Sequence, residues 1–512
     1  MFNIFDMINF PLLSSSIPPN KKEAFIKRRE FFEEIKQKLN EKQITIISGI
    51  PGSGKSICIH EYVRKLDDKA VIVRWFNAGN YENILRGFKE IALELNTDLT
   101  NRNKFFNDIY SIIYTIKNTL KKCTKKIIFV FDNVNNYDDI SFLSNLPNNI
   151  KILITTRNEN LLSPNIDINY IYLKEFTLDE AREYLKFNLS LYRLLSSQNI
   201  ESIISKVNLT PYILAKVSTF LKLNEYMDIN EYLAKLELKD SNQAESDILF
   251  DDLLIKEDGP KAWNLLQYLS YLDPYFINIK IIKKLLSIEE DEFQNIVKIL
   301  KSYSLVSIIH DQYGEIGLKL NPLIQNEVRI YAADKVHYYD QTEIKDSILE
   351  TLNSIMPKII NHVDKNFFST KLLYLHVKKV LENNINIELL SETSTFNIAN
   401  LSHKLGVYYN LTLKKYDQAI IYQEKAVEII RSLCLINEKY IIYKKDFLVA
   451  LNSTYESLSG AQKAQKIHIE SNADCAFNED RIHHEKNFGS HSDGDILLDP
   501  VVKFMGHAPY SD

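Results

Sequence analysis

The stretch Gly49-Ile50-Pro51-Gly52-Ser53-Gly54-Lys55-Ser56 fits the pattern G-x-x-x-x-G-K-S/T of a phosphate-binding loop, or P-loop. In such a loop the glycines let successive backbone N–H groups turn toward phosphate oxygens. The β-branched run at 43–48 predicts a buried strand before the loop, and residues 57–66 predict a helix after it. Strand, loop and helix in this order are the setting that the pattern requires, so a chance match in a glycine-rich turn is the weaker interpretation.

The loop supplies most of the candidate nucleotide-binding residues. The N-terminus of the following helix adds partial positive charge, and Lys55 is able to reach the β- and γ-phosphates of a nucleotide. The Ser56 hydroxyl is a candidate Mg²⁺ ligand. We therefore expect ATP or ADP with Mg²⁺ to bind through Gly49, Ile50, Pro51, Gly52, Ser53, Gly54, Lys55, Ser56 and Ile57.

Two later strands are predicted to end in functional side chains. Residues 126–133 predict a strand in which 127–131 are all apolar, as expected of a parallel strand covered on both faces, and the carboxyl end of such a strand lies near the loop. This Walker B pattern predicts that Asp132 holds Mg²⁺ through water. Residues 151–157 predict another strand, whose final Arg157 could face the γ-phosphate, with a surface arginine as the alternative. Lys55, Asp132 and Arg157 are thus the candidate catalytic residues.

The order of these motifs is similar to that of the STAND class of P-loop ATPases, and most similar to its NB-ARC branch. That branch occurs in apoptosis adaptors, plant resistance proteins and many bacterial regulators, and its layout fits residues 20–335. Residues 25–29 take the place of the family's aromatic-Val-Gly-Arg-Glu segment but lack its glycine and glutamate. The resemblance implies a multidomain α/β and α fold, with a P-loop parallel sheet covered by helices on both faces, followed by helical domains.

The resemblance also implies how the chain is divided into domains. A capping box at Thr177–Glu180 predicts a helix start just after the nucleotide-binding part. We expect an N-terminal segment at 1–20, the P-loop domain at 21–168, a helical lid domain at 169–245, a winged-helix domain at 246–335, a helical region with tetratricopeptide-like repeats at 336–472 and a disordered tail at 473–512.

Two residues outside the loop complete the expected nucleotide-binding set. Pro211 lies in a segment similar to the family's Gly-Leu-Pro-Leu motif, which implies packing on the adenine side of the nucleotide. A first position in a helix is the structural alternative for Pro211, and the two roles are compatible. Asn321 occupies the place of the histidine in the family's Met-His-Asp motif, which contacts the ADP phosphate. An amide is still able to donate a hydrogen bond there.

DNA binding by the winged helix is not expected. Three predicted helices, near 262–269, 277–286 and 289–301, are followed by two strands around a turn. The third helix opens with four acidic residues at 289–292 and carries only Lys298 and Lys301 as cations. Phosphate contacts need a basic face, and the whole chain has a net charge of −5.

The C-terminal part predicts protein interaction. Residues 400–427 resemble one tetratricopeptide repeat, in which small alanines let two helices approach closely, and a weaker echo follows at 447–471. We expect a protein partner to bind these helices. A metal site formed by Cys475 and the histidines of the tail is the weaker alternative to disorder, because the spacings match no common motif.

Composition indicates a protein of a reducing compartment. The four cysteines, Cys58, Cys123, Cys434 and Cys475, lie far apart and suggest no disulfide framework. Residues 1–10 are apolar but lack the basic region of a signal peptide, and no run of uncharged apolar residues is long enough for a transmembrane helix. We expect a cytoplasmic location without membrane contact, and secretion into a host cell is the alternative.

Together these features predict an ATP- and ADP-binding molecular switch with slow hydrolysis. Asn133 stands where many relatives carry a second acidic residue, and an amide cannot act as a general base. Asp138 and Asp139 are candidate substitutes a few residues later. We expect the open state to self-associate, and enzymatic turnover stays an open question. A nucleotide-binding scaffold with degenerate hydrolysis, an AAA-like ATPase and a transcription regulator are the alternatives.

Overall fold

The computed structural model describes residues 13–18, 25–66, 70–95, 109–123, 125–158, 161, 167–190, 192, 195–239, 243–310, 314–334, 341–357, 367–383 and 390–460. The chain separates into two compact units, Met1–Thr454 and Tyr455–Asp512. The predicted boundary at 472/473 lies outside the described residues, as do the tail and its candidate metal ligands.

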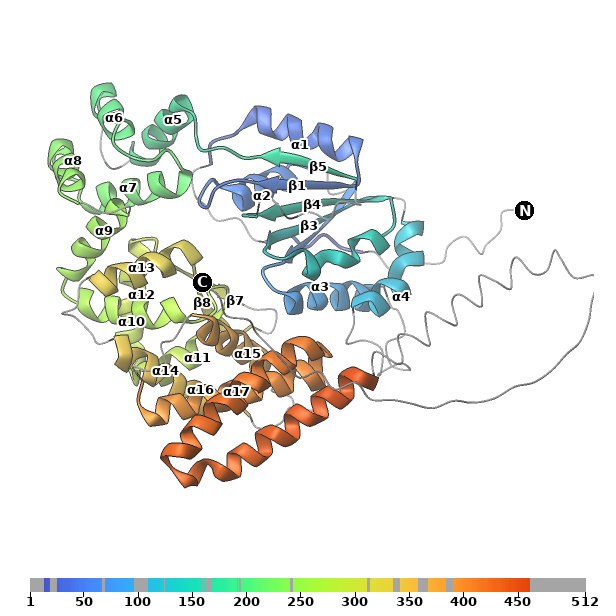
Figure 1. Ribbon diagram of the computed structural model, residues 1–512. Helices are drawn as coiled ribbons and strands as arrows, with labels where there is room; N and C mark the ends of the chain where they lie inside the picture. Colours follow the sequence, from blue (N-terminus) through green and yellow to red (C-terminus); the bar gives the residue numbers. More distant parts are fainter. Residues whose placement is uncertain are drawn as a thin grey trace, which may run out of the picture. The chain divides into compact units, whose positions relative to one another are not determined.

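A five-stranded parallel sheet forms the nucleotide-binding part of the first unit (Figure 1). The strand order is β2-β3-β4-β1-β5, so β1, the strand before the P-loop, lies between β4 and β5, the last two strands of the sheet in the sequence. The bounds are Ile44–Ser48 for β1, Val71–Asn77 for β2, Lys126–Val134 for β3, Ile150–Thr156 for β4 and Ile168–Tyr172 for β5.

Helices cover both faces of this sheet, and the strand residues alternate between the two (Figure 1). Phe129 and Phe131 point to the face packed by α3, α4 and the 3-10 helix η3, whereas Val130 points to the face packed by α1 and α2. Burial on both sides explains the continuous apolar runs of the strands. The helices span Arg29–Glu41 (α1), Lys55–Arg64 (α2), Tyr81–Glu94 (α3), Ile109–Lys122 (α4) and Tyr137–Asn145 (η3). This confirms the predicted fold class.

Residues 13–18 extend the outer edge of the sheet. Ser16 forms a parallel bridge with Arg74, in which its N–H donates to the Val73 carbonyl at 2.8 Å and its carbonyl accepts from the Trp75 N–H at 3.0 Å. The edge strand β2 therefore has part of its open hydrogen-bonding side covered by the chain's own N-terminal segment.

Helices α5 to α9 follow the sheet. Thr177 caps α5 in the predicted capping box with Glu180, and Pro211 lies in the first turn of α7, as the structural alternative for this residue predicted. The helices span Leu178–Leu189 (α5), Ser197–Ile204 (α6), Pro211–Leu223 (α7), Ile229–Glu237 (α8) and Ala244–Leu254 (α9).

The next segment combines helices with a small antiparallel sheet of order β6-β8-β7. Its elements are α10 (Gly259–Tyr271), β6 (Ile277–Asn278), α11 (Ile279–Leu286), α12 (Glu290–Ser302), β7 (Val306–His310), β8 (Ile316–Leu320) and α13 (Pro322–Asp334). Three helices and a hairpin were expected here, and the assignment as a winged helix stays a prediction.

The C-terminal helices of the first unit pack closely on one another. A Cβ added at Gly406 of α16 would lie 2.5 Å from Cγ of Gln423 in α17. The two helices therefore approach closely at a glycine, which leaves room for the Gln423 side chain. Ala419 and Ala426 of α17 are fully buried. The elements are α14 (Gln341–Ile355), α15 (Phe367–Glu382), α16 (Glu392–Tyr408), the π-helix η5 (Tyr409–Leu413), α17 (Tyr416–Ile436) and the 3-10 helix η6 (Glu438–Tyr440). The tetratricopeptide identity of this pair stays a prediction. Within the described part of the chain, no helix is both long enough and apolar enough to cross a membrane.

Candidate nucleotide-binding site

The P-loop joins β1 to α2 through backbone conformations that favour glycine. Gly52 and Gly54 have φ values of 83° and 90°, in the left-handed region, and Gly54 is the N-cap of α2. A Cβ at Gly52 would also lie 2.7 Å from Cβ of Tyr212. Gly52 is therefore needed both for the turn and for the close approach of α7, and the helix begins at Lys55, two residues earlier than predicted.

Lys55 lies buried within the loop. Its Nζ donates to the carbonyl oxygens of Gly49 at 2.6 Å and Ile50 at 2.9 Å. Burial and, to a lesser extent, the nearby charge of Arg157 lower the pKa of Lys55 to about 8, and Asp132 opposes the shift. Lys55 thus carries its positive charge at neutral pH but loses it more readily than an exposed lysine does.

The candidate magnesium ligands meet at the ends of β3 and β4. The Ser56 hydroxyl donates to Oδ1 of Asp132 at 2.6 Å, and the Thr155 hydroxyl donates to the same oxygen at 2.6 Å. The backbone N–H of Asn133 donates to Thr155 Oγ1, also at 2.6 Å. Hydroxyl and carboxylate oxygens are hard ligands that suit Mg²⁺. The sequence analysis did not single out Thr155; its role follows from the register that pairs Phe131 with Ile154.

A cavity of about 1020 Å³, at the upper end of the size range of ligand pockets, lies in front of the loop. Its walls come from the loop, the ends of β3 and β4, α7 and residues 303–308 and 319–324. Gly49, Ile50 and Pro51 belong to the loop but do not line the cavity. The predicted residues that do line it are Gly52, Ser53, Gly54, Lys55, Ser56, Ile57, Asp132, Arg157, Pro211 and Asn321.

Helix α7 lies directly against the loop. The Tyr212 N–H donates to the Gly52 carbonyl at 3.3 Å, and Pro211 Cγ lies 3.6 Å from where a Cβ of Gly54 would be. The Tyr212 hydroxyl reaches Glu327 of α13 at 2.7 Å, and Lys216 Nζ lies 2.5 Å from the same Glu327 carboxylate. The loop is thereby connected to α13 through two side chains of α7 that the sequence analysis missed.

Tyr275 contacts the end of β3. Its hydroxyl hydrogen-bonds to the side-chain amide of Asn133, although the two residues are 142 positions apart in the sequence. Asn133 has a φ of 65° and lies where the pairing of β3 with β4 shifts register. Burial raises the pKa of Tyr275, so its hydroxyl stays protonated. No local pattern around Tyr275 could have predicted this contact.

Asn321 has a structural role in addition to lining the cavity. Its side-chain oxygen accepts a hydrogen bond from the Leu323 N–H at 3.0 Å and so caps the start of α13. The predicted contact of Asn321 with an ADP phosphate stays a prediction.

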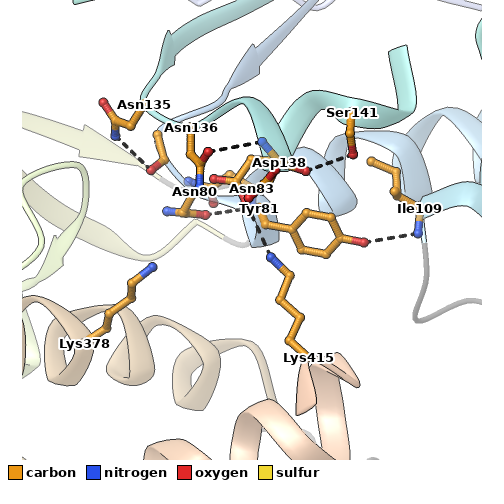
Figure 2. A network of polar contacts seen from close by, with 12 residues as sticks. Asn80, Tyr81, Asn83, Ile109, Asn135, Asn136, Asp138, Ser141, Lys378 and Lys415 are labelled. Atoms are coloured by element: carbon orange, nitrogen blue, oxygen red, sulfur yellow. Dashed lines mark hydrogen bonds and ion pairs between the residues drawn. The ribbon is translucent and has the colours of Figure 1, made fainter. Parts of the chain in front are cut away.

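Asp138 and Asp139 lie outside the cavity lining. Asp139 Oδ1 lies 3.5 Å from Nζ of Lys415, whose ammonium group lies 3.7 Å from the centre of the Tyr81 ring. Figure 2 shows Lys378 and Lys415 extending from the C-terminal helices toward this part of α3 and η3. The expectation that Asp138 or Asp139 replaces the missing acidic residue is therefore wrong, because η3 directs this segment toward the C-terminal helices.

The P-loop, the Ser56–Asp132 pair and the parallel sheet define a P-loop nucleoside triphosphatase fold. Residues 28–186 match the family model described as the NB-ARC domain. The chain thus contains an NB-ARC domain in this stretch, as the order of its motifs predicted.

Solved structures show a more distant likeness. A STAND protein with a tetratricopeptide repeat sensor from Pyrococcus horikoshii is 17% identical with a TM-score of 0.45, covering 89% of this chain and 69% of its own. A Walker-type ATPase of Pyrococcus abyssi is 16% identical with a TM-score of 0.31, covering 62% of this chain and 100% of its own. Neither likeness bears on what this chain binds. No curated protein matches the sequence significantly.

Proposed function

We propose that this protein is a nucleotide-dependent switch that binds ATP or ADP with Mg²⁺ at the P-loop. The observation that carries the proposal is the meeting of the Ser56 hydroxyl and the Asp132 carboxylate, 2.6 Å apart, at the edge of a cavity that also contains Lys55. A hydroxyl and a carboxylate beside a glycine-rich loop form a donor set that fits a magnesium-bound phosphate chain.

Different residues of the site contact different parts of the bound nucleotide and its magnesium ion. The loop surrounds the phosphates with backbone N–H groups, and Lys55 and Arg157 balance their negative charge. Ser56 and Asp132 would hold Mg²⁺, which supplies charge neutralisation between the β- and γ-phosphates when it is bound. Pro211 and Asn321 line the same cavity, where Pro211 packs on the adenine side of the nucleotide and the Asn321 amide donates to a phosphate of ADP.

Hydrolysis is slow in this proposal. Asn133 follows Asp132 on β3, its amide group is hydrogen-bonded to Tyr275, and an amide cannot take a proton from water. This feature also favours the second candidate function, a scaffold that binds nucleotide without turning it over.

A change between two conformations is proposed because the walls of the cavity come from separate segments of the chain. They come from the sheet, from α7 and from residues 303–308 and 319–324, so a nucleotide that contacts all of these favours one arrangement of the segments. We propose that the C-terminal helices bind a protein partner in the cytoplasm and that the open form self-associates. The acidic start of α12, with Glu290, Asp291 and Glu292 in its first turn, opposes binding to DNA.

The nucleotide content of freshly purified protein tests the proposal. The protein is denatured and the released nucleotide is separated by chromatography, alongside Lys55→Ala and the control Lys36→Ala, which removes an exposed lysine of α1. Bound ADP or ATP in the wild type and in the control, but not in Lys55→Ala, is the expected result. A wild-type protein that is empty and fails to bind added nucleotide with Mg²⁺ would refute the proposal.

Turnover separates the two candidate functions. A slow release of phosphate, well below about 1 s⁻¹, supports a switch that hydrolyses its ligand. Tight binding with no release of phosphate over many hours supports the scaffold instead. Turnover well above about 1 s⁻¹ would contradict both, because Asn133 offers no base.

A further inference from the structure

The short segment Asp273-Pro274-Tyr275, between α10 and β6, touches two elements that are far apart in the sequence. At one end the Tyr275 hydroxyl hydrogen-bonds to the side-chain amide of Asn133 in β3. At the other end the backbone N–H of Asp273 donates to Nδ1 of His376 in α15 at 3.0 Å. The segment therefore connects the nucleotide site with the C-terminal helices.

The segment is stiff. The Tyr275 N–H donates back to Oδ1 of Asp273 at 3.1 Å, and the ring of Pro274 restricts both its own φ and the residue before it. The Pro274 carbonyl also accepts from the Leu320 N–H at 2.9 Å, at the end of β8. These contacts restrict the movement of Asp273 and Tyr275 relative to each other.

The Asn133 end is closely packed. A Cβ added at Gly79 would lie 3.2 Å from Nδ2 of Asn133 and 3.3 Å from the hydroxyl oxygen of Tyr275. The backbone N–H of Asn133 donates a hydrogen bond to Thr155 Oγ1, and the Thr155 hydroxyl donates one to Asp132. Movement of the Tyr275 hydroxyl therefore changes the surroundings of the candidate magnesium ligand.

The His376 end is buried. His376 has 0% exposure, and burial lowers its pKa to about 4, so the ring is neutral at physiological pH and Nδ1 is free to accept the Asp273 N–H. Its Nε2 has no hydrogen-bond partner among the described residues. The Asp273 N–H is thus the polar contact that orients this ring.

We propose that Asp273-Pro274-Tyr275 is a relay that couples the position of α15 to the end of β3, with Tyr275 as the positioning residue for Asn133. When α15 shifts, for example on binding of a protein partner to the C-terminal helices, the relay releases Asn133 and loosens the nucleotide site. Its effect on nucleotide release rests on the proposed function, whereas the mechanical coupling does not.

The coupling is tested first without nucleotide, by amide hydrogen exchange of a peptide that covers residues 131–135 in the full chain. Tyr275→Phe and His376→Leu should each accelerate exchange there about fivefold, the factor expected from one lost hydrogen bond. His376→Asn, whose side-chain oxygen is able to replace Nδ1 as acceptor, should restore protection. Tyr440→Phe, which removes a hydroxyl bonded to Glu392 elsewhere, is the matched control and should have no effect.

Each result of this measurement decides the inference. Faster exchange at 131–135 with unchanged exchange in β1 supports the relay, and rescue by His376→Asn excludes a general loss of folding. If His376→Leu leaves exchange at 131–135 as in the wild type, the link to α15 is refuted. If Tyr275→Phe also leaves it unchanged, Tyr275 does not position Asn133.

Release of a fluorescent ADP analogue then tests coupling through a double-mutant cycle. Tyr275→Phe and His376→Leu should each speed release about fivefold, and the double variant should be no faster, because both changes interrupt one connection. If the double variant instead releases the analogue about 25-fold faster than the wild type, the two effects multiply, the contacts are independent and the relay is refuted. A wild-type protein that binds no analogue refutes the proposed function, and the exchange result then still decides the relay.

Discussion

Breaking the buried ion pair between Lys216 of α7 and Glu327 of α13 by removing one partner should strongly lower the free energy of unfolding. The two side chains are only 7% and 12% exposed, their charged atoms lie 2.5 Å apart, and Glu327 also accepts from the Tyr212 hydroxyl at 2.7 Å. Glu327→Ala leaves a buried ammonium group without its counter-ion. We expect this variant to lose about 3–5 kcal/mol of unfolding free energy.

The chain contains a suitable probe for this measurement. Trp263 of α10 is buried and packs against Tyr331 of α13, with ring centroids 5.0 Å apart, and the chain has only one other tryptophan, Trp75. In a Trp75→Phe background, Trp263 fluorescence during urea unfolding therefore reports the loss of packing around α13. The midpoint and slope of the transition give the change in free energy.

Two further variants separate charge burial from simple loss of a side chain. Glu231→Ala removes an exposed partner of Lys235, 3.7 Å away on α8, and should change stability by only about 0.3–0.5 kcal/mol. Lys216→Met combined with Glu327→Leu removes both charges but also the acceptor of the Tyr212 hydroxyl, so it should lose about 1–3 kcal/mol, less than Glu327→Ala. The reasoning is refuted if Glu327→Ala costs no more than Glu231→Ala, or if the double variant is as unstable as Glu327→Ala.

Three other predictions follow from single contacts. Because Lys55 has a lowered pKa of about 8, affinity for an ADP analogue should fall as pH rises through that value, and Lys55→Arg, which stays charged, should abolish the pH dependence. Thr155→Val removes the hydroxyl that donates to Asp132, so the magnesium-dependent binding of nucleotide, measured by calorimetry, should weaken by about 1–3 kcal/mol. Binding equal to that of the wild type would count against the site. Gly406→Ala places a Cβ 2.5 Å from Cγ of Gln423 and should cost about 1–3 kcal/mol in thermal unfolding followed by circular dichroism, whereas a neutral effect would mean that α16 and α17 adjust freely.

Much of the nucleotide-binding part could be predicted because its signals are local. The spacing of Gly49, Gly52 and Gly54 reflects backbone conformations that each residue adopts by itself, and the apolar strands reflect burial on both faces of a sheet. The position of Asp132 at the edge beside the loop followed from the general rule that parallel strands end on the same side. Ser56 and Asp132 accordingly lie together as expected.

Other parts of the site could not be predicted in this way. Asp139 looked like a substitute for an acidic residue because it follows Asp132 closely, yet η3 directs it toward Lys415, 276 residues later. The cap that the side-chain oxygen of Asn321 provides to α13 was likewise not foreseen, and the predicted phosphate contact of its amide group stays a prediction. In both cases a neighbour that is distant in sequence, or a helix start, decides the role of the side chain.

The sequence by itself determined the phosphate-binding loop, the strands on either side of it and the helical character of the remainder, because backbone preference and hydrophobic periodicity act over a few residues. The tertiary structure alone decided which side chains close around the site. Tyr275 reaches Asn133 across 142 positions, and Lys216 reaches Glu327 across 111. Such pairs depend on how whole segments pack, and a hydrogen bond acts over only about 3 Å, so no local pattern encodes them.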